Sequence, residues 1–209
     1  MAGDKRVIRV GISSCLLGNP VRYDGGHKLD RVLCDALGRL VRWVPVCPEV
    51  ECGLPVPRES LHLIGAPASP RLLTVRTGID HTDRIGAWAA RRLEELAEQD
   101  LCGFVFKSRS PSCGLRRIAI LPPGGSLPQA GAGIFARAVM ARFPLLPVED
   151  EMRLAHPRIR DGFVERLLAF QRGRRSRPNA VAGDELLQPP GSSRARRGGR
   201  SRSRPRTPS

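Results

Sequence analysis

Six cysteines carry the most distinctive chemistry in this sequence of 209 residues. None of them forms a CxxC pair, the spacing typical of a local zinc knuckle. The sequence opens with no signal pattern and has no apolar run near the ~18 to 20 residues that span a bilayer. We therefore expect a soluble cytoplasmic protein without a membrane span, in which cysteines are thiols or metal ligands rather than disulfides. They are Cys15, Cys34, Cys47, Cys52, Cys102 and Cys113.

Three of these cysteines lie where predicted strands end. The carboxyl ends of parallel strands meet at one edge of a sheet, and ligands bind in the crevice beyond that edge. Three thiolates gathered there fit two chemistries: zinc with an open fourth position, or an iron–sulfur cluster with one iron that lacks a protein ligand. The three are Cys15 after the strand at 6–13, Cys47 at the end of the strand at 42–47, and Cys113 after the strand that begins at Leu101.

The other three cysteines have simpler interpretations. Cys34 falls within an amphipathic helical pattern and Cys102 at the start of an apolar strand, where cysteine usually acts as a small buried hydrophobe. Cys52 follows Cys47 closely in a loop, so it is either incidental or a thiol that supports the metal site.

Polar residues near the three strand-end cysteines suggest acid–base chemistry. Glu49 comes two residues after Cys47, close enough to serve the same pocket as a proton donor or acceptor. Lys107 ends its strand, and the turn at 108–114, which includes Ser112, offers hydroxyl and backbone N–H groups to thiolate or sulfide charge. The alternative for each of these residues is an ordinary solvated turn.

The elements that must position these residues alternate between strands and helices. Such alternation predicts an α/β fold with a mostly parallel sheet and helices on both faces. In the helix at 28–41 we expect Leu29, Val32, Leu33, Leu37 and Leu40 to face inward, and in the helix at 80–100 we expect Thr82 or Asp83 to be the N-cap. The predicted strands are 6–13, 42–47, 72–77, 101–108 and 145–150, and the predicted helices are 28–41, 80–100, 132–143 and 157–172.

The net charge of +15 is concentrated at the C-terminus. From Arg172 onward, 11 Arg oppose only Asp184 and Glu185, so +9 of the charge lies there and +6 in the first 171 residues. That segment is rich in Arg, Ser, Pro and Gly without apolar periodicity, which predicts a disordered tail at 173–209 after a domain at 1–172. The tail is suited to sequence-independent phosphate binding but contains no aromatic residue for base stacking.

Four stretches in order resemble one known family between about Val7 and Arg153. The family was long catalogued as a domain of unknown function, and it includes the bacterial thiouracil desulfurases. The stretches are "SSCLLGNPVRYDGGHK", "VPVCPEVECGLPVPRES", "GFVFKSRSPSCG" and "GIFARAVMARFPLLPVEDE".

The resemblance implies a Rossmann-like domain that holds a [4Fe-4S] cluster through Cys15, Cys47 and Cys113. It also implies a reaction without net redox change, in which the open iron takes the sulfur of a thiolated pyrimidine or similar small thiocarbonyl and hydrosulfide leaves. Glu49 would then be the acid–base residue. Lys107 and Ser112 would contact substrate or cluster, and Tyr23 and Asp24, in "VRYDG", would line the substrate pocket.

The sequence departs from the family pattern at two places. Many relatives have a Gly-Gly pair after "CPE", where this chain has "VECGL" with Cys52. Longer relatives continue into a second helical domain, and the segment at 157–172 resembles its beginning before the pattern ends near Gly173. The Arg-rich tail supports a second functional hypothesis. In it, the chain is a non-catalytic metal-site protein that binds nucleic acid through the tail.

Overall fold

Two four-stranded sheets organise the computed structural model, which describes residues 7–124 and 127–175. In the first sheet all pairings are parallel and the strand order is β2-β1-β5-β8. Its strands are β1 (Ile8–Ser13), β2 (Val41–Val46), β5 (Gly103–Phe106) and β8 (Val148–Asp150). This sheet confirms the predicted α/β class and most of the predicted strand positions.

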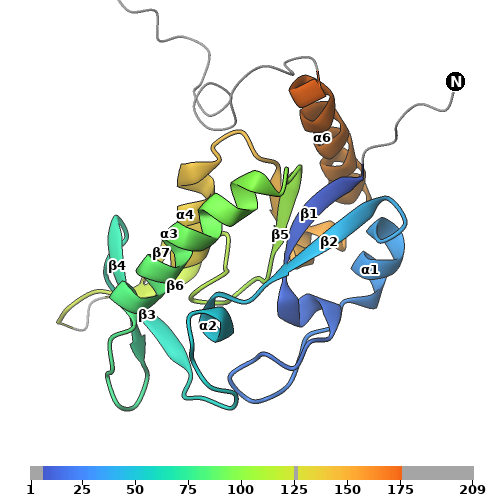
Figure 1. The fold of residues 1–209 in the computed structure, drawn as a ribbon. Helices are drawn as coiled ribbons and strands as arrows, with labels where there is room; N and C mark the ends of the chain where they lie inside the picture. Colours follow the sequence, from blue (N-terminus) through green and yellow to red (C-terminus); the bar gives the residue numbers. More distant parts are fainter. Residues whose placement is uncertain (1–6, 125–126, 176–209) are drawn as a thin grey trace, which may run out of the picture.

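Strand β5, one of the two inner strands of this sheet, is buried on both faces, as expected of a parallel sheet covered by helices. Phe104 and Phe106 point to a core formed with α3 (Thr82–Glu98) and α4 (Ile134–Arg142), while Val105 points to a core formed with α1 (Arg31–Leu37) and α6 (Pro157–Arg175). Figure 1 shows these two helix pairs on opposite sides of β5. Gly11 of β1 lies so close to Phe104 that an added Cβ would overlap the ring.

The second sheet was not predicted. Its order is β4-β3-β6-β7, with β3 antiparallel to β4, parallel to β6, and β6 antiparallel to β7. Only β4 was anticipated, and it covers 69–74 rather than 72–77 because the chain turns at Thr77, whose hydroxyl contacts Thr74 at 2.7 Å. The strands are β3 (Leu61–Ala66), β4 (Ser69–Thr74), β6 (Ile118–Leu121) and β7 (Gln129–Gly131).

The helix predicted at 28–41 is much shorter than its apolar pattern suggested. The backbone N–H groups of Lys28 and Asp30 donate to Cys15 and Leu16, which holds this segment outside the helix, and the Asp30 carboxylate then caps α1. Leu33 and Leu37 are buried as expected, but the other three residues predicted to face inward, Leu29, Val32 and Leu40, are exposed.

Helix α3 agrees closely with its pattern, and Ile85, Trp88, Ala89, Leu93 and Leu96 are all buried. Its N-cap is His81, not Thr82 or Asp83. The Asp80 carboxylate accepts a hydrogen bond from the Thr82 N–H at 2.8 Å, so the N-terminal capping acceptor lies before the residues proposed from sequence.

Three short helices complete the fold. A 3-10 turn, η1 (Ser14–Leu17), follows β1; α2 (Pro48–Glu51) follows β2; and α5 (Glu151–Leu154) follows β8. Each begins at the carboxyl end of a parallel strand, at the sheet edge predicted to hold the site.

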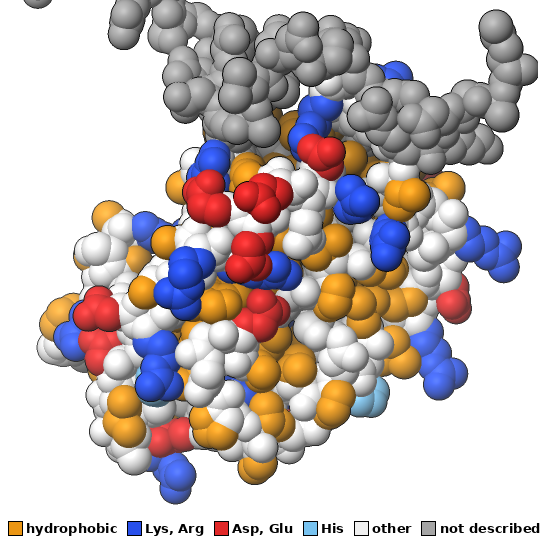
Figure 2. Space-filling view, viewed as in Figure 1, with side chains coloured by type: hydrophobic (Ala, Val, Ile, Leu, Met, Phe, Trp, Pro, Cys, Tyr) orange, Lys and Arg blue, Asp and Glu red, His pale blue; other side chains and the backbone are white. Residues whose placement is uncertain are grey.

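The surface of the described part carries charges of both signs. Figure 2 shows acidic side chains interspersed with Lys and Arg over the face formed by α2 and α3. No helix among residues 7–124 and 127–175 is long and apolar enough to cross a membrane. Helix α6 continues past its predicted end to Arg175, and the rest of the predicted tail lies outside the described residues.

Candidate metal centre and active site

The three strand-end cysteines line one cavity of about 1050 Å³. Cys15 lies in η1 after β1, Cys47 directly follows β2, and Cys113 lies in the turn after β5. Because β1 pairs with both β2 and β5, these three strand ends are adjacent. Burial is the main cause of the raised pKa of Cys113, and the neighbouring Cys47 and Cys15 raise it further.

Burial sets the protonation state of these thiols. It raises the pKa of Cys47 to about 11 and that of Cys113 well above its usual value, and it also raises the pKa of Cys15. A thiol must lose its proton to bind a metal, so this site releases protons when a metal binds and favours a cationic group that offsets the thiolate charge.

Each cysteine is held by its own local contacts. The Cys15 carbonyl accepts from Gly18 and Lys28, and the Cys47 N–H donates to the Glu51 carboxylate at 2.7 Å. The Cys113 N–H donates to the Ser110 hydroxyl at 3.1 Å. The Ser-Pro turn therefore orients Cys113 toward the cavity.

Helix α4 fixes the same turn from behind. Its first backbone N–H groups donate to carbonyls of the turn, from Ile134 to Pro111 at 3.1 Å and from Phe135 to Ser112 at 2.9 Å. A helix N-terminus has free N–H groups to satisfy, and here the turn supplies the acceptors.

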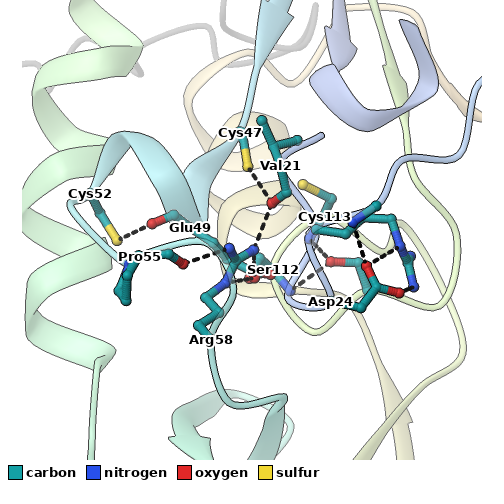
Figure 3. A network of polar contacts seen from close by, with 12 residues as sticks. Val21, Asp24, Cys47, Glu49, Cys52, Pro55, Arg58, Ser112 and Cys113 are labelled. Atoms are coloured by element: carbon teal, nitrogen blue, oxygen red, sulfur yellow. Dashed lines mark hydrogen bonds and ion pairs between the residues drawn. The ribbon is translucent and has the colours of Figure 1, made fainter. Parts of the chain in front are cut away.

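Glu49 lines the cavity with its carboxylate held by two partners. Arg58 donates to Oε2 from Nε at 2.9 Å and from Nη2 at 2.5 Å, and the Ser112 hydroxyl donates to Oε1 at 2.8 Å. Figure 3 shows this network, with Arg58 also reaching the carbonyl oxygens of Val21 and Pro55. Ser112 is fully buried and is not among the cavity-lining residues, so its contact is with Glu49.

Lys107 also lines the cavity, and its ammonium is paired. Nζ lies 2.5 Å from Oε1 of Glu151, whose carboxylate also accepts from the backbone and hydroxyl of Ser108. The Lys107 N–H donates to the Ser13 hydroxyl at 2.8 Å, and Ser13 partly offsets the effect of burial, which raises the pKa of Cys113.

The two predicted pocket-wall residues differ in their placement. Tyr23 lines the cavity with 44% of its surface exposed. Asp24 is not among the lining residues: its carboxylate accepts from the Gly26 N–H at 3.0 Å and from Arg22, contacts that lower its pKa.

The remaining cysteines do not line the cavity. The Cys52 thiol lies 3.2 Å from the Glu49 carbonyl oxygen, Cys34 contacts the Leu16 carbonyl, and Cys102 is buried beside Asp100. All six cysteines are free thiols.

The three strand-end thiols fit an iron–sulfur cluster that leaves one iron without a protein ligand. Zinc would need all three sulfurs at about 2.3 Å from one centre. The thiolates of an iron–sulfur cluster each bind a different iron, so they lie farther apart.

Comparison with known proteins places the chain. The model of the family described as 2-thiouracil desulfurase matches residues 10–151, which contain all three strand-end cysteines. The chain belongs to the 2-thiouracil desulfurase family. Its fold is similar to that of a solved [4Fe-4S]-dependent thiouracil desulfidase, TudS, with a TM-score of 0.58 and 32% identity over 78% of this chain and 98% of that one. A search of curated proteins finds no match.

Two residues of this desulfurase family member were missed from sequence. Arg58 and Glu151 hold Glu49 and Lys107, and both lie inside stretches that carry the family resemblance, "VPRES" and "VEDE". Their charge and their position in those stretches were the available signal, but their partners are distant in sequence.

Proposed function

We propose that this protein is an iron–sulfur enzyme that removes sulfur from a thiolated pyrimidine or a similar small thiocarbonyl. The observation that carries the proposal is the meeting of three thiols from three strand ends, two buried and one half-buried, on one cavity that also contains a carboxylate. Family membership and the [4Fe-4S]-dependent structural neighbour support it.

Cys15, Cys47 and Cys113 would hold the [4Fe-4S] cluster. When bound, a cluster with three protein ligands supplies an iron with an open position, a soft Lewis acid suited to a thiocarbonyl sulfur. The reducing cytoplasm is the expected location, since there the thiols remain available.

The reaction exchanges sulfur for oxygen without electron transfer. Water adds its oxygen to the thiocarbonyl carbon, the carbon–sulfur bond breaks, and the sulfur leaves as hydrosulfide with one proton of water, while the second proton goes to solvent. Glu49 is the proposed residue that takes a proton from water and returns one toward the departing sulfur. Arg58 and Ser112 fix its carboxylate through the contacts described above.

Other lining residues shape the pocket. The Lys107 ammonium, held by Glu151, places a positive charge at the cavity where anionic sulfur leaves. Tyr23 would form part of the substrate wall, and Asp24 would act on that wall through Arg22, which lines the cavity.

The second hypothesis, a nucleic-acid-binding protein with a structural metal, gains no support from the described residues. Their surface mixes charges over the face shown in Figure 2, and the Arg-rich segment lies outside them from residue 176.

Anaerobic purification followed by metal analysis tests the cluster. We expect a brown protein with about four iron per chain. Zinc in place of iron would contradict the proposal.

Incubation with 2-thiouracil tests the activity. We expect release of sulfide and uracil, loss of release in Glu49→Gln with iron retained, and normal release in Glu165→Gln, a change on the exposed face of α6. Iron-loaded protein that releases no sulfide from any thiopyrimidine would contradict the substrate class.

A further inference from the structure

Cys47 stands at a helix start that it does not cap itself. It is the N-cap of α2, and its side chain makes no capping hydrogen bond. Helix N-caps are usually Ser, Thr, Asp or Asn, whose side-chain oxygen accepts from the first turn. Cysteine sulfur is only a weak hydrogen-bond acceptor, so the start of α2 gains support from a stronger acceptor elsewhere.

Glu51 supplies that support from the end of the same turn. Its Oε1 accepts from the Cys47 N–H at 2.7 Å, which resembles the reach-back of a capping box. The helix has only one turn and is marginal by itself. Of its two carboxylates, Glu49 faces the cavity and Glu51 holds the backbone of the cysteine.

Arg92 anchors Glu51 to a helix outside the proposed ligand set. Its Nε lies 3.2 Å from Oε2 of Glu51, an ion pair without hydrogen-bond geometry, and its Nη1 donates a hydrogen bond to Oε2 of Glu95 at 2.6 Å, one turn along α3. The Arg92 side chain is only 16% exposed, so its orientation is restricted. Figure 1 shows α2 beside α3, whose other face is buried in the core.

We propose that Arg92 and Glu51 are positioning residues that fix Cys47 as a cluster ligand, coupling the metal centre to α3. The inference rests on the proposed function. Partners that orient a ligand from outside the coordination sphere are worth about 10- to 100-fold in metal affinity. The direct link to Cys47 is the hydrogen bond of Glu51, and Arg92 acts by holding the carboxylate that accepts it.

The test measures iron release to a chelator, the visible charge-transfer spectrum and the cluster reduction potential in anaerobic full-length protein. We expect Glu51→Ala to release iron about tenfold faster or more than wild type, with an altered spectrum and potential. Glu51→Gln keeps an oxygen that accepts from Cys47 but loses the ion pair with Arg92, so its iron release should be only about threefold faster than wild type.

Glu95→Gln is the matched control, since Glu95 also pairs with Arg92 but is more exposed and is not the acceptor for Cys47. We expect it to leave release and potential unchanged. Iron release from Glu51→Ala at the wild-type rate, or an equal acceleration in Glu95→Gln, would overturn the inference but not the proposal that the protein holds a cluster. Wild-type protein without iron would instead overturn the proposed function, and this inference with it.

Arg92→Gln keeps the test decisive if Glu51→Ala does not fold. This variant leaves Glu51 able to reach Cys47 but removes its ion-pair partner. We therefore expect iron release about threefold faster than wild type, a smaller acceleration than in Glu51→Ala, which removes the acceptor itself. Release at the wild-type rate from folded Arg92→Gln would overturn the role of Arg92.

Discussion

Single residues at this site act through partners that are distant in sequence. The Glu49 carboxylate depends on Arg58 and Ser112, and Lys107 depends on Glu151. The three proposed ligands are thiols whose pKa values lie above the usual range, so they remain protonated near neutral pH until a metal displaces the proton. Substitution of one of these residues therefore also changes the residues that it pairs with.

Cys113→Ala should remove most of the iron from anaerobically purified protein, because only two thiolate ligands would remain. Cys52→Ala is the control, since the Cys52 thiol faces the Glu49 carbonyl oxygen and does not line the cavity. Iron analysis after reconstitution measures both. Full iron content in Cys113→Ala would exclude Cys113 from the ligand set.

Arg58→Gln should lower the free energy of unfolding by about 1–3 kcal/mol, because it leaves the partly buried Glu49 carboxylate without its charge partner. In the double variant with Glu49→Gln no unpaired charge remains, so part of the loss should be recovered. Urea unfolding of the three proteins measures this coupling. Strictly additive losses would show that the pair is not coupled.

At the scale of elements, the site depends on helix ends that meet turns. The N-terminus of α4 donates to the Pro111 and Ser112 carbonyls, and Gly133, the N-cap of α4, packs directly against the turn. An added Cβ at Gly133 would lie 2.6 Å from the Ser112 carbonyl carbon and oxygen. The backbone there has no room for any side chain.

Gly133→Ala should displace the turn that carries Cys113, lowering iron retention and lowering the unfolding free energy by about 1–3 kcal/mol. Gly86→Ala on α3 is the control, since a Cβ there meets nothing within 4 Å. That change should stabilise the protein by about 0.5–1 kcal/mol. Thermal unfolding and iron release measure both effects, and unchanged iron retention in Gly133→Ala would contradict this role of α4.

At the scale of the molecule, the second sheet must be attached to the first. Asp80 stands at one junction, where its carboxylate accepts from Thr82 at the start of α3 and from Arg71 of β4 at 2.8 Å. The Thr82 hydroxyl is the largest cause of the lowered pKa of Asp80, which is about 2. An unfolded aspartate has a pKa of about 3.9.

Because the folded pKa of Asp80 is below the unfolded one, its ionised form adds stability that is fully present above about pH 4 and is lost as pH falls toward about 2. Asp80→Asn should therefore be less stable than wild type at pH 6, with a difference that shrinks in acid. Urea unfolding across this range measures it, and Arg71→Gln should reduce the same pH dependence. A difference independent of pH would contradict the assignment.

Sequence alone was sufficient where the signal is local or repeats along one element. Alternation of strand and helix patterns predicted the parallel sheet, and the helical spacing of apolar residues in α3 predicted which of its residues are buried. Four motifs in order indicated the family, which the family match confirmed. Cysteines placed after strands were expected at one edge because parallel strands end together, and they line one cavity there.

Tertiary structure decided what depends on contacts between distant segments. The second sheet pairs β3 with β6, which lie more than fifty residues apart in the sequence. Neither short strand shows an alternation of apolar and polar residues that would identify it as a strand. Backbone contacts to Cys15 and Leu16 shortened α1 and left Leu29 and Val32 exposed at the cavity. Likewise, the sequence shows that Arg58, Glu51 and Arg92 are charged, but it does not show what they contact. Folding brings Arg58 to the Glu49 carboxylate, Glu51 to the Cys47 N–H, and Arg92 to the Glu51 carboxylate.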